Sequence, residues 1–476
     1  MDTQEVLKFA DDLVFTKTGK HLDNLQEAIL RGTVQGKKYS KIAEENNCTQ
    51  GHVKDVASEV WKILSEILGE EVSKSNFRAT FERLRVSNIS HVGKDIVHIG
   101  NVNVCRDTLH SPEMTTTRSQ SSQPPHQENP NPKPCQDLGN MPDVSSFYGR
   151  TEELATLEQW IVEERCRLVT LLGMSGIGKT ALAVQLVERI KDNFDYVIWR
   201  SLRFSPPAEA IQRNLLQFVS NQQETELPIS TDGTLSQLMD YLRKYRCLVI
   251  LDNVQMIFNT GQFAGHYKPG YEDYGSLFRR VGKLSHNSCL ALSGWESPIE
   301  LVALTGENTP IRSFQLKGLR VAAGDILREK GLVEEDSWED LIHAYRGNPL
   351  WLKIVATMIR DLCNGKASDY LKYNTSLLCE ELKAILNQQF ERLSGLEKEV
   401  MSCLGNQVES VSTAKLLEDI QISPSELFSA IQSLERRSLI EKQVQDNQTV
   451  FTLVPVVRQF VKSHYSHIDG SDPRLL

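Results

Sequence analysis

"LLGMSGIGKTALAVQL", residues Leu171–Leu186, is the stretch that decides the fold of this chain. An apolar run typical of a buried strand ends at Gly173, and an amphipathic helix pattern begins at Lys179. The residues between them match G-x-x-x-x-G-K-[ST], a loop whose backbone N–H groups curl around phosphate oxygens at a helix N-terminus. The stretch therefore predicts an α/β fold that binds a nucleotide.

Each residue of this phosphate loop has an expected contact. Backbone N–H groups should surround the phosphates, while the Lys179 ammonium reaches the β- and γ-phosphates and the Thr180 hydroxyl binds Mg²⁺. The nucleotide-binding residues that the loop predicts are Gly173, Met174, Ser175, Gly176, Ile177, Gly178, Lys179 and Thr180.

A second magnesium ligand is expected at the end of another buried strand. The run "RCLVILDNVQ" supplies Asp252 after a series of apolar residues, and we expect Asp252 to bind Mg²⁺ together with Thr180. The next residue is Asn253, whose amide cannot take a proton from water. Two interpretations stay open: the nucleotide is bound without turnover, or Asn253 orients a water molecule and hydrolysis is slow. The sequence therefore leaves ATPase activity open.

The composition predicts a protein of several folded domains. The chain has 476 residues, a net charge of −9 and nine scattered cysteines, which favours a reducing cytoplasm and argues against a disulfide framework or a zinc site. No apolar run reaches the length of about 18 residues that a membrane span needs, and the N-terminus has no signal-peptide pattern. The negative charge gives no general attraction to nucleic acid, so any DNA contact would have to be local.

Changes in composition divide the chain into regions. Residues 106–146 are rich in Ser, Thr, Gln, Asn and Pro, which predicts a flexible tether. After the tether, short apolar runs alternate with helix patterns, as in a parallel sheet covered by helices on both faces. The expected regions are an all-α helix-turn-helix domain at 1–90, an extended linker at 91–145, a P-loop nucleotide-binding domain at 146–319, a helical subdomain at 320–380, a winged-helix domain at 381–466 and a tail at 467–476.

The winged-helix prediction comes from one helix and the two strands after it. Ser423 should cap this helix, with Pro424 as its first residue and Glu426 completing a capping box. Two strand patterns follow, separated by a turn at residues 445–447. Arg436 and Arg437 are expected on a solvated helix end, where the helix dipole favours cations.

Five stretches taken together resemble the NB-ARC class of STAND (signal-transduction) P-loop NTPases. They are "FYGRTEEL", the phosphate loop, "LVILDNV", "SCLALSGWESP" and "YRGNPLWLKI", and the resemblance covers about residues 146–464. It implies that Arg150 lies over the nucleotide and that Pro349 touches the nucleotide from the helical subdomain. It also implies that ADP holds the domains closed, whereas ATP–Mg²⁺ favours an open state that associates with itself.

The chain departs from this family pattern at positions linked to hydrolysis and to the closed state. Where the family carries an arginine at a strand end, this chain has Ser293, Gly294 and Trp295. A His-Asp pair of the family's winged helix is matched here by Leu453 and Val454. The departures leave nucleotide binding intact, and they weaken the expectation of ATP hydrolysis.

The front of the chain resembles the helix-turn-helix domain of vWA-MoxR-associated (vMAP-type) proteins over Tyr39–Leu84, with Thr49 as the N-cap of the third helix. A DNA-binding role and a role in protein docking or self-association both stay open. Residues 1–90 hold 13 Lys and Arg and 14 Asp and Glu, whereas phosphate binding needs a basic face. The candidate DNA-contact residues are Lys37, Lys38, Gln50, His52 and Lys54.

The sequence thus predicts a switch that binds ADP or ATP with Mg²⁺, in which the nucleotide controls domain opening, self-association and the N-terminal effector domain. The alternatives are a nucleotide-gated DNA-binding transcription regulator and a slow ATPase. The expected partners are the nucleotide and a protein or a second copy of the chain, without membrane contact. The expected location is the cytoplasm.

Overall fold

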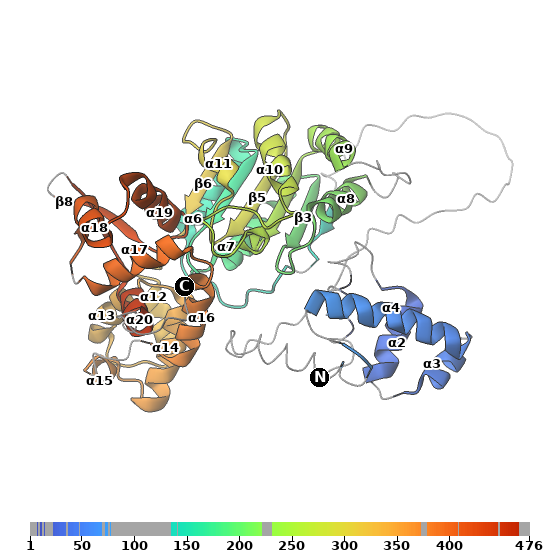
Figure 1. Ribbon diagram of the computed structural model, residues 1–476, viewed down its shortest axis with the longest axis horizontal. Coiled ribbons are helices and arrows are strands. Elements are labelled where there is room, and N and C mark those ends of the chain that lie inside the picture. Colours follow the sequence, from blue (N-terminus) through green and yellow to red (C-terminus); the bar gives the residue numbers. More distant parts are fainter. Residues whose placement is uncertain are drawn as a thin grey trace, which may run out of the picture.

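The computed structural model shows a sheet domain, a C-terminal helical region and a group of N-terminal helices (Figure 1). All structural statements below refer to the described residues. These are 22–34, 37–46, 48–68, 72–74, 135–139, 141–220, 231–372, 378–407, 409–445 and 448–465, with Leu7, Ala10, Asp11, Val14 and Phe77.

The sheet domain is built on a six-stranded parallel sheet with the strand order β1-β3-β4-β5-β2-β6. Side chains alternate between its two faces, with Leu248 and Ile250 on one and Val249 and Leu251 on the other. Both faces of the inner strands are buried, which explains why those strands read as apolar runs. The strands are β1 (Cys135–Asp137), β2 (Leu168–Leu172), β3 (Tyr196–Ser201), β4 (Cys247–Asp252), β5 (Cys289–Gly294) and β6 (Ile311–Gln315).

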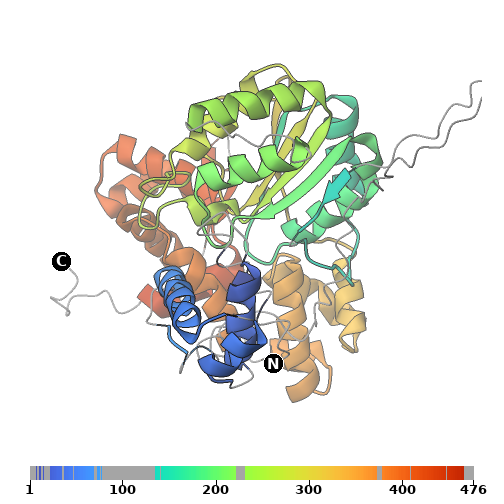
Figure 2. The same cartoon turned by 90° about the vertical axis from the view of Figure 1, so that its right-hand side faces the viewer.

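Helices cover both faces of this sheet (Figures 1 and 2), so the predicted α/β P-loop class is confirmed. One face packs against α6 (Thr151–Glu158), the π-helical turn η1 (Gln159–Glu163) and α7 (Lys179–Ile190). The other face packs against α8 (Ala208–Val219), α9 (Thr231–Lys244), α10 (Asp273–Lys283) and α11 (Ile299–Val302). Two 3₁₀ turns connect elements of this domain, η2 (Lys191–Asn193) and η3 (Val254–Ile257).

The sheet begins at Cys135, before residue 145, where the sequence analysis placed the end of the linker. Strand β1 lies inside the region assigned to the linker, where it pairs in parallel with β3. Arg200 of β3 donates to the Asp137 carbonyl oxygen at 3.3 Å and also pairs with the Asp137 carboxylate. A three-residue edge strand without an apolar run has no periodicity to detect, which is why the boundary was wrong.

The helical subdomain and the winged helix share one hydrophobic core, although the sequence divided them near residue 380. Helix α16 connects them, because Leu386 and Phe390 belong to the cluster that also contains α14 and α20. The helices are α12 (Ala323–Glu329), α13 (Trp338–Ala344), α14 (Pro349–Leu362), α15 (Ala367–Leu371), α16 (Glu380–Phe390), α17 (Gly395–Asn406), α18 (Thr413–Ile420), α19 (Pro424–Arg436) and α20 (Pro455–Tyr465). The 3₁₀ turn η4 (Glu335–Ser337) precedes α13.

The winged-helix prediction is confirmed in its local details. Ser423 and Glu426 form the capping box of α19, with Pro424 in the first turn. The antiparallel strands follow in the order β7-β9-β8. They are β7 (Val411–Ser412), β8 (Glu441–Gln445) and β9 (Gln448–Thr452). The central residues of the predicted turn lie outside the described part of the chain.

One expectation for α19 was wrong. Arg437, placed by sequence on a solvated helix end, is 3% exposed and forms ion pairs with Glu296 and Glu397. Sequence spacing shows only the position of a charge along a helix. It does not reveal the acidic groups that another domain brings to that position.

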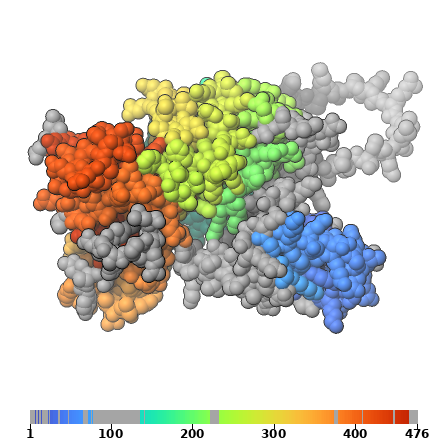
Figure 3. All heavy atoms as spheres, in the orientation of Figure 1, coloured from blue at the N-terminus to red at the C-terminus, as the bar shows by residue number. Residues whose placement is uncertain are grey.

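The N-terminal helices are α2 (Asn24–Val34), α3 (Tyr39–Glu45) and α4 (Gln50–Leu68). They form their own core around Ile29, Val53 and Trp61, consistent with the helix-turn-helix prediction. The N-cap is in place, because the His52 backbone N–H donates to the Thr49 hydroxyl at 3.2 Å. Figure 3 shows this group as a blue lobe beside the rest of the molecule. Within the described residues, none of the helices combines the length and apolar character needed to cross a membrane.

Candidate nucleotide-binding site

The phosphate loop connects β2 to α7 and lies at the carboxyl edge of the sheet. Gly176 has a φ of 78°, in the left-handed region that glycine adopts without strain. The loop also has no room there for a side chain, because a Cβ on Gly176 would lie 2.6 Å from the Cβ of Leu350. The glycine is therefore required both by the loop conformation and by the close approach of α14.

The donors of this loop fit a phosphate group. As at any helix start, the first amides of α7 have no partner within the helix. Among the hydrogen bonds of the described residues, none uses the backbone N–H of Gly176, Gly178 or Lys179 as donor. These groups and the positive end of the α7 dipole form a cradle suited to an anion.

Lys179 is buried inside the loop. Its ammonium donates to the carbonyl oxygens of Gly173 and Met174, both at 2.9 Å. Burial lowers the pKa of Lys179 to about 7, and the nearby Asp252 carboxylate opposes that shift. A negatively charged ligand would favour the protonated ammonium, because an opposite charge raises the pKa of a lysine.

Thr180 and Asp252 are brought together across the sheet, as the magnesium prediction requires. The Thr180 hydroxyl donates to Asp252 Oδ2 at 3.0 Å. Asp252 is the last residue of β4 and is 5% exposed, and this burial raises its pKa. Its neighbours in the sheet register are Ser201 and Ser293. The oxygen donors of Thr180 and Asp252 suit a hard divalent cation such as Mg²⁺.

Asn253 lies directly before the turn η3 and has a left-handed conformation, with a φ of 62°. Its amide nitrogen donates to Asp252 Oδ2 at 3.2 Å and to Ser201 Oγ at 3.3 Å. Its amide oxygen accepts from the Gln255 side chain at 3.3 Å. The side chain thus orients the residues around Asp252, and it has no group that can act as a general base.

Arg150, which the resemblance places over the nucleotide, lies beside the phosphate loop. It is 7% exposed, donates to the Ile177 carbonyl oxygen at 3.2 Å and pairs with Glu153 at 2.7 Å. One arginine thereby fixes the start of α6 to the phosphate loop.

The helical subdomain contacts the loop directly at the start of α14. The Asn348 side chain donates to the Ser175 carbonyl oxygen at 2.9 Å, and the Leu350 backbone N–H donates to the Gly176 carbonyl oxygen at 3.3 Å. Pro349 lies between these two residues, with its ring near Gly178. Sequence reasoning named Pro349 and missed Asn348, although an N-cap before a proline was a usable signal.

Trp295 stands where the family pattern would place an arginine, and another arginine comes close to it in space. The Arg392 guanidinium lies over the Trp295 ring, 6.0 Å from its centroid. Arg392 is held by Glu296 and by backbone carbonyl groups, so it does not act as a free cation at the site. Nothing in the sequence around Arg392 indicated this position.

The candidate DNA-contact residues form no continuous basic surface. Gln50, His52 and Lys54 are exposed on α4, in agreement with the predicted orientation of that helix. Lys37, however, pairs with Glu45 at 2.7 Å, and Lys38 is exposed at the start of α3. Local pairing reduces the positive charge that phosphate binding would require.

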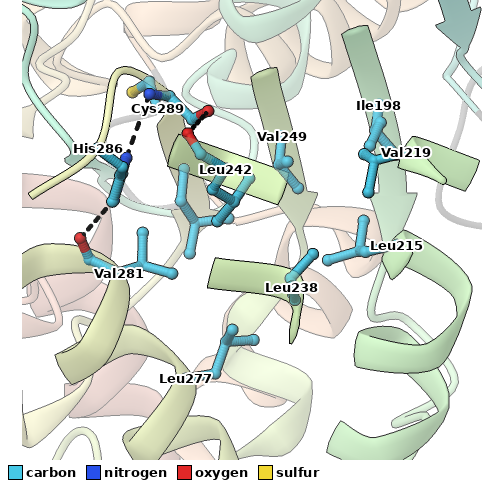
Figure 4. Close-up of a pocket in the computed structure, with 12 residues that line it drawn as sticks. Ile198, Leu215, Val219, Leu238, Leu242, Val249, Leu277, Val281, His286 and Cys289 are labelled. Carbon is cyan, nitrogen blue, oxygen red and sulfur yellow. Dashed lines mark hydrogen bonds between the residues drawn. The ribbon is translucent and has the colours of Figure 1, made fainter. Parts of the chain in front are cut away.

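A small cavity, separate from the phosphate loop, lies between the sheet and helices α8, α9 and α10 (Figure 4). Its lining is almost entirely aliphatic, with His286 at one end, and it offers about 10 Å³ of space. That volume is enough for a single water molecule. The cavity is therefore too small for a nucleotide, and the phosphate loop at the sheet edge is the candidate nucleotide site.

Two parts of the chain match known families. Residues 1–84 match a family model described as vWA-MoxR associated protein N-terminal HTH, and residues 150–259 match the NB-ARC domain. The second match begins at Arg150, contains the phosphate loop and extends past Asp252. Residues 150–259 are therefore an NB-ARC domain and residues 1–84 a vMAP-type helix-turn-helix domain, as both resemblances predicted.

The chain is also similar to individual proteins. It shares 43% identity over 346 residues with an uncharacterised WD repeat-containing protein of Nostoc sp., a match that covers 70% of this chain. The chain spans 27% of that relative's length. A Walker-type ATPase of Pyrococcus abyssi is 17% identical with a TM-score of 0.47, covering 66% of this chain and 96% of that one. A STAND protein with a tetratricopeptide repeat sensor from Pyrococcus horikoshii is 18% identical with a TM-score of 0.35, covering 68% and 44%.

Proposed function

We propose that this protein is a nucleotide-dependent switch that binds ADP or ATP with Mg²⁺. The observation that carries the proposal is the direct bonding of the helical subdomain to the phosphate loop through Asn348 and Leu350. A ligand in the loop would touch two structural units at once. Its phosphates can therefore favour one arrangement of these units over another by differential affinity.

Each residue of the site has a proposed role. The loop amides and Lys179 bind the phosphates, and Arg150 and Pro349 cover the nucleotide from α6 and from the helical subdomain. Thr180 and Asp252 hold Mg²⁺, which would neutralise phosphate charge when bound. The buried position of Lys179 and Asp252 supports these roles, because charges in a site of low dielectric interact strongly with a charged ligand.

Hydrolysis is proposed to be slow. Asn253 cannot accept a proton, and its amide is engaged with Asp252, Ser201 and Gln255. A switch is consistent with slow hydrolysis, because a bound nucleotide must persist long enough to define a state. An ATPase that slowly turns over its nucleotide is the alternative, and phosphate release measured over hours separates it from a switch that retains ATP.

The N-terminal helices are proposed to be the effector that the nucleotide domain controls, with self-association in the ATP state. The mixed charge of residues 1–90 and the Lys37–Glu45 pair favour docking to protein over binding to DNA. Retention of duplex DNA by the full chain at low salt, weakened as salt rises, would instead support the gated DNA-binding alternative.

The binding proposal is tested by calorimetry with ADP and ATP, with and without Mg²⁺. We expect Lys179→Ala to weaken binding by about 100-fold, because a charge-assisted contact to phosphate is lost from a buried site. The matched control is Lys191→Ala at the opposite end of α7, which should bind like the wild type. Equal affinity of the wild type and Lys179→Ala would contradict the proposal. Light scattering after exchange of ADP for ATP–Mg²⁺ tests self-association.

A further inference from the structure

A buried group of polar and charged residues joins the sheet domain to the winged helix. Glu296 comes from the loop after β5, whereas the other members come from the C-terminal region. The four charged members are almost fully enclosed, with exposed fractions of 1% for Glu296, 7% for Arg392, 0% for Glu397 and 3% for Arg437. We call the group the interdomain network, and its members are Glu296, Arg392, Glu397, Ser433 and Arg437.

Glu296 is the centre of this network. Its carboxylate accepts from Arg392 Nη2 at 2.7 Å and pairs with Arg437 Nη1 at 2.9 Å. It also accepts from the backbone N–H of Gly265 at 3.0 Å. One carboxylate of the sheet domain therefore binds two arginines that belong to the C-terminal region.

Arg392 connects the network to the segment that follows Asp252. Its Nη2 donates to the Gln255 carbonyl oxygen at 2.8 Å and to the Phe258 carbonyl oxygen at 3.4 Å. Gln255 belongs to the turn η3, which begins directly after Asn253, and Phe258 follows the turn directly. The position of η3 and the position of the winged helix are thus fixed through the same guanidinium.

Arg437 and Ser433 bind the chain segment beyond η3. Arg437 donates to the Gln262 carbonyl oxygen at 2.7 Å and to Glu397 at 3.0 Å. The Ser433 hydroxyl accepts from the Ala264 backbone N–H at 2.7 Å and donates to Glu397 at 2.6 Å. The segment between η3 and α10 is consequently bound to Ser433 and Arg437 at the end of α19.

The charges of the network stabilise the interface only while they remain paired. Two carboxylates and two guanidinium groups balance one another while buried, and removing one partner leaves an uncompensated buried charge. A small displacement of the winged helix would leave the Glu296 carboxylate buried without either arginine, which is costly. A larger separation would expose Glu296 to water, while Arg437 would keep its ion pair with Glu397.

We infer that the interdomain network is a latch that holds the winged helix against the sheet domain, and that η3 couples this latch to the nucleotide site. This inference rests on the proposed function, which makes the bound nucleotide the signal, and it names the contacts through which the nucleotide would act on the winged helix. The latch depends on Glu296, Arg392 and Arg437, and it needs no contact between the winged helix and the nucleotide.

The experiment uses the full chain loaded with ADP and compares three variants. Glu296→Gln keeps the side-chain size and removes the charge that both arginines share, and Arg437→Met removes one guanidinium. The control is Lys415→Met in α18, whose pair with Asp419 at 2.8 Å lies on the surface of the winged helix. The measurements are hydrogen exchange of residues 261–265 and α19, the rate of ADP release, and the midpoint of thermal unfolding.

We expect Glu296→Gln and Arg437→Met to speed both hydrogen exchange at the interface and ADP release by about tenfold or more, well below the unfolding temperature. Lys415→Met should match the wild type. A lower unfolding midpoint in Glu296→Gln with unchanged exchange and release would overturn the inference, because the network would then only stabilise the fold. If Arg437→Met does not fold, Glu296→Gln decides the question.

The two proposals fail in different ways. A wild type that binds no ADP would contradict the proposed function, and hydrogen exchange of the nucleotide-free variants would still test the latch. A wild type that retains ADP, with variants whose interface exchanges as slowly as its own, would leave the switch standing and reject the latch.

Discussion

His286 is a single buried residue whose hydrogen bonds define its protonation state. Its Nε2 lies 2.7 Å from the Val281 carbonyl oxygen, and its Nδ1 accepts from the Ser288 backbone N–H at 3.2 Å (Figure 4). Nε2 must therefore carry the proton and Nδ1 must be bare, as in a neutral imidazole. Burial lowers the pKa of His286.

This arrangement predicts a loss of stability in acid. Because the folded state lowers the pKa below the unfolded value of about 6.5, the unfolded chain binds more protons as pH falls below that value. We expect the free energy of unfolding to decrease by at most about 1.4 kcal/mol per pH unit from this residue. Denaturant unfolding at pH 8 and pH 5.5 measures the effect, and His286→Gln and His286→Leu should reduce the difference between the two. An undiminished difference in both variants would assign the acid sensitivity to other groups.

The contact between the phosphate loop and α14 belongs to the scale of elements. The Asn348 side chain binds both elements. Its oxygen caps α14 by accepting from the Trp351 backbone N–H at 3.4 Å, and its nitrogen donates to the Ser175 carbonyl oxygen of the phosphate loop. The backbone just before Asn348 also packs closely against Leu319, since a Cβ on Gly347 would lie 1.9 Å from the Leu319 carbonyl oxygen. The start of α14 is thus positioned both by the phosphate loop and by the contact between Gly347 and Leu319.

Two substitutions at position 348 separate the helix cap from the loop contact. Asn348→Asp keeps an acceptor for the cap and loses the donor to Ser175, whereas Asn348→Ala loses both. We expect Asn348→Asp to release ADP about tenfold faster with an unchanged helix content, and Asn348→Ala to lose about 1 kcal/mol of stability in addition. Circular dichroism and nucleotide release measure the two effects. Wild-type release in Asn348→Asp would show that the contact to Ser175 does not control the nucleotide.

At the scale of the whole molecule, the shared core predicts how the C-terminal region unfolds. Leu386 of α16 is fully buried in the cluster that contains both the helical subdomain and the winged helix. Leu386→Ala should cost about 2–5 kcal/mol and lower the stability of both parts in one transition. The matched control is Leu362→Ala, which changes a side chain that is 77% exposed. Hydrogen exchange resolved by peptide measures the effect, and destabilisation confined to one of the two parts would contradict a common core.

Patterns of neighbouring residues predicted most of the fold and, in the candidate site, the phosphate loop and Asp252. The phosphate loop, Asp252 after its strand and the capping box at Ser423 each depend on residues close together in sequence, so periodicity and spacing predicted them. The structure confirms that Thr180 and Asp252 meet, because strands of a parallel sheet end at one edge. The short strand β1 had no such pattern and was missed.

Tertiary structure alone decided how the domains are joined. Glu296, Arg392 and Arg437 lie far apart in sequence, and each reads as an ordinary surface charge until folding buries them together. The single core of the helical subdomain and the winged helix was equally hidden, because two amphipathic faces do not reveal which partner they cover. The sequence by itself predicted a phosphate loop and the candidate magnesium ligands Thr180 and Asp252, each from a local pattern of residues. The connection of that loop to the winged helix depends on burial and on pairing across long separations, which only the folded chain defines.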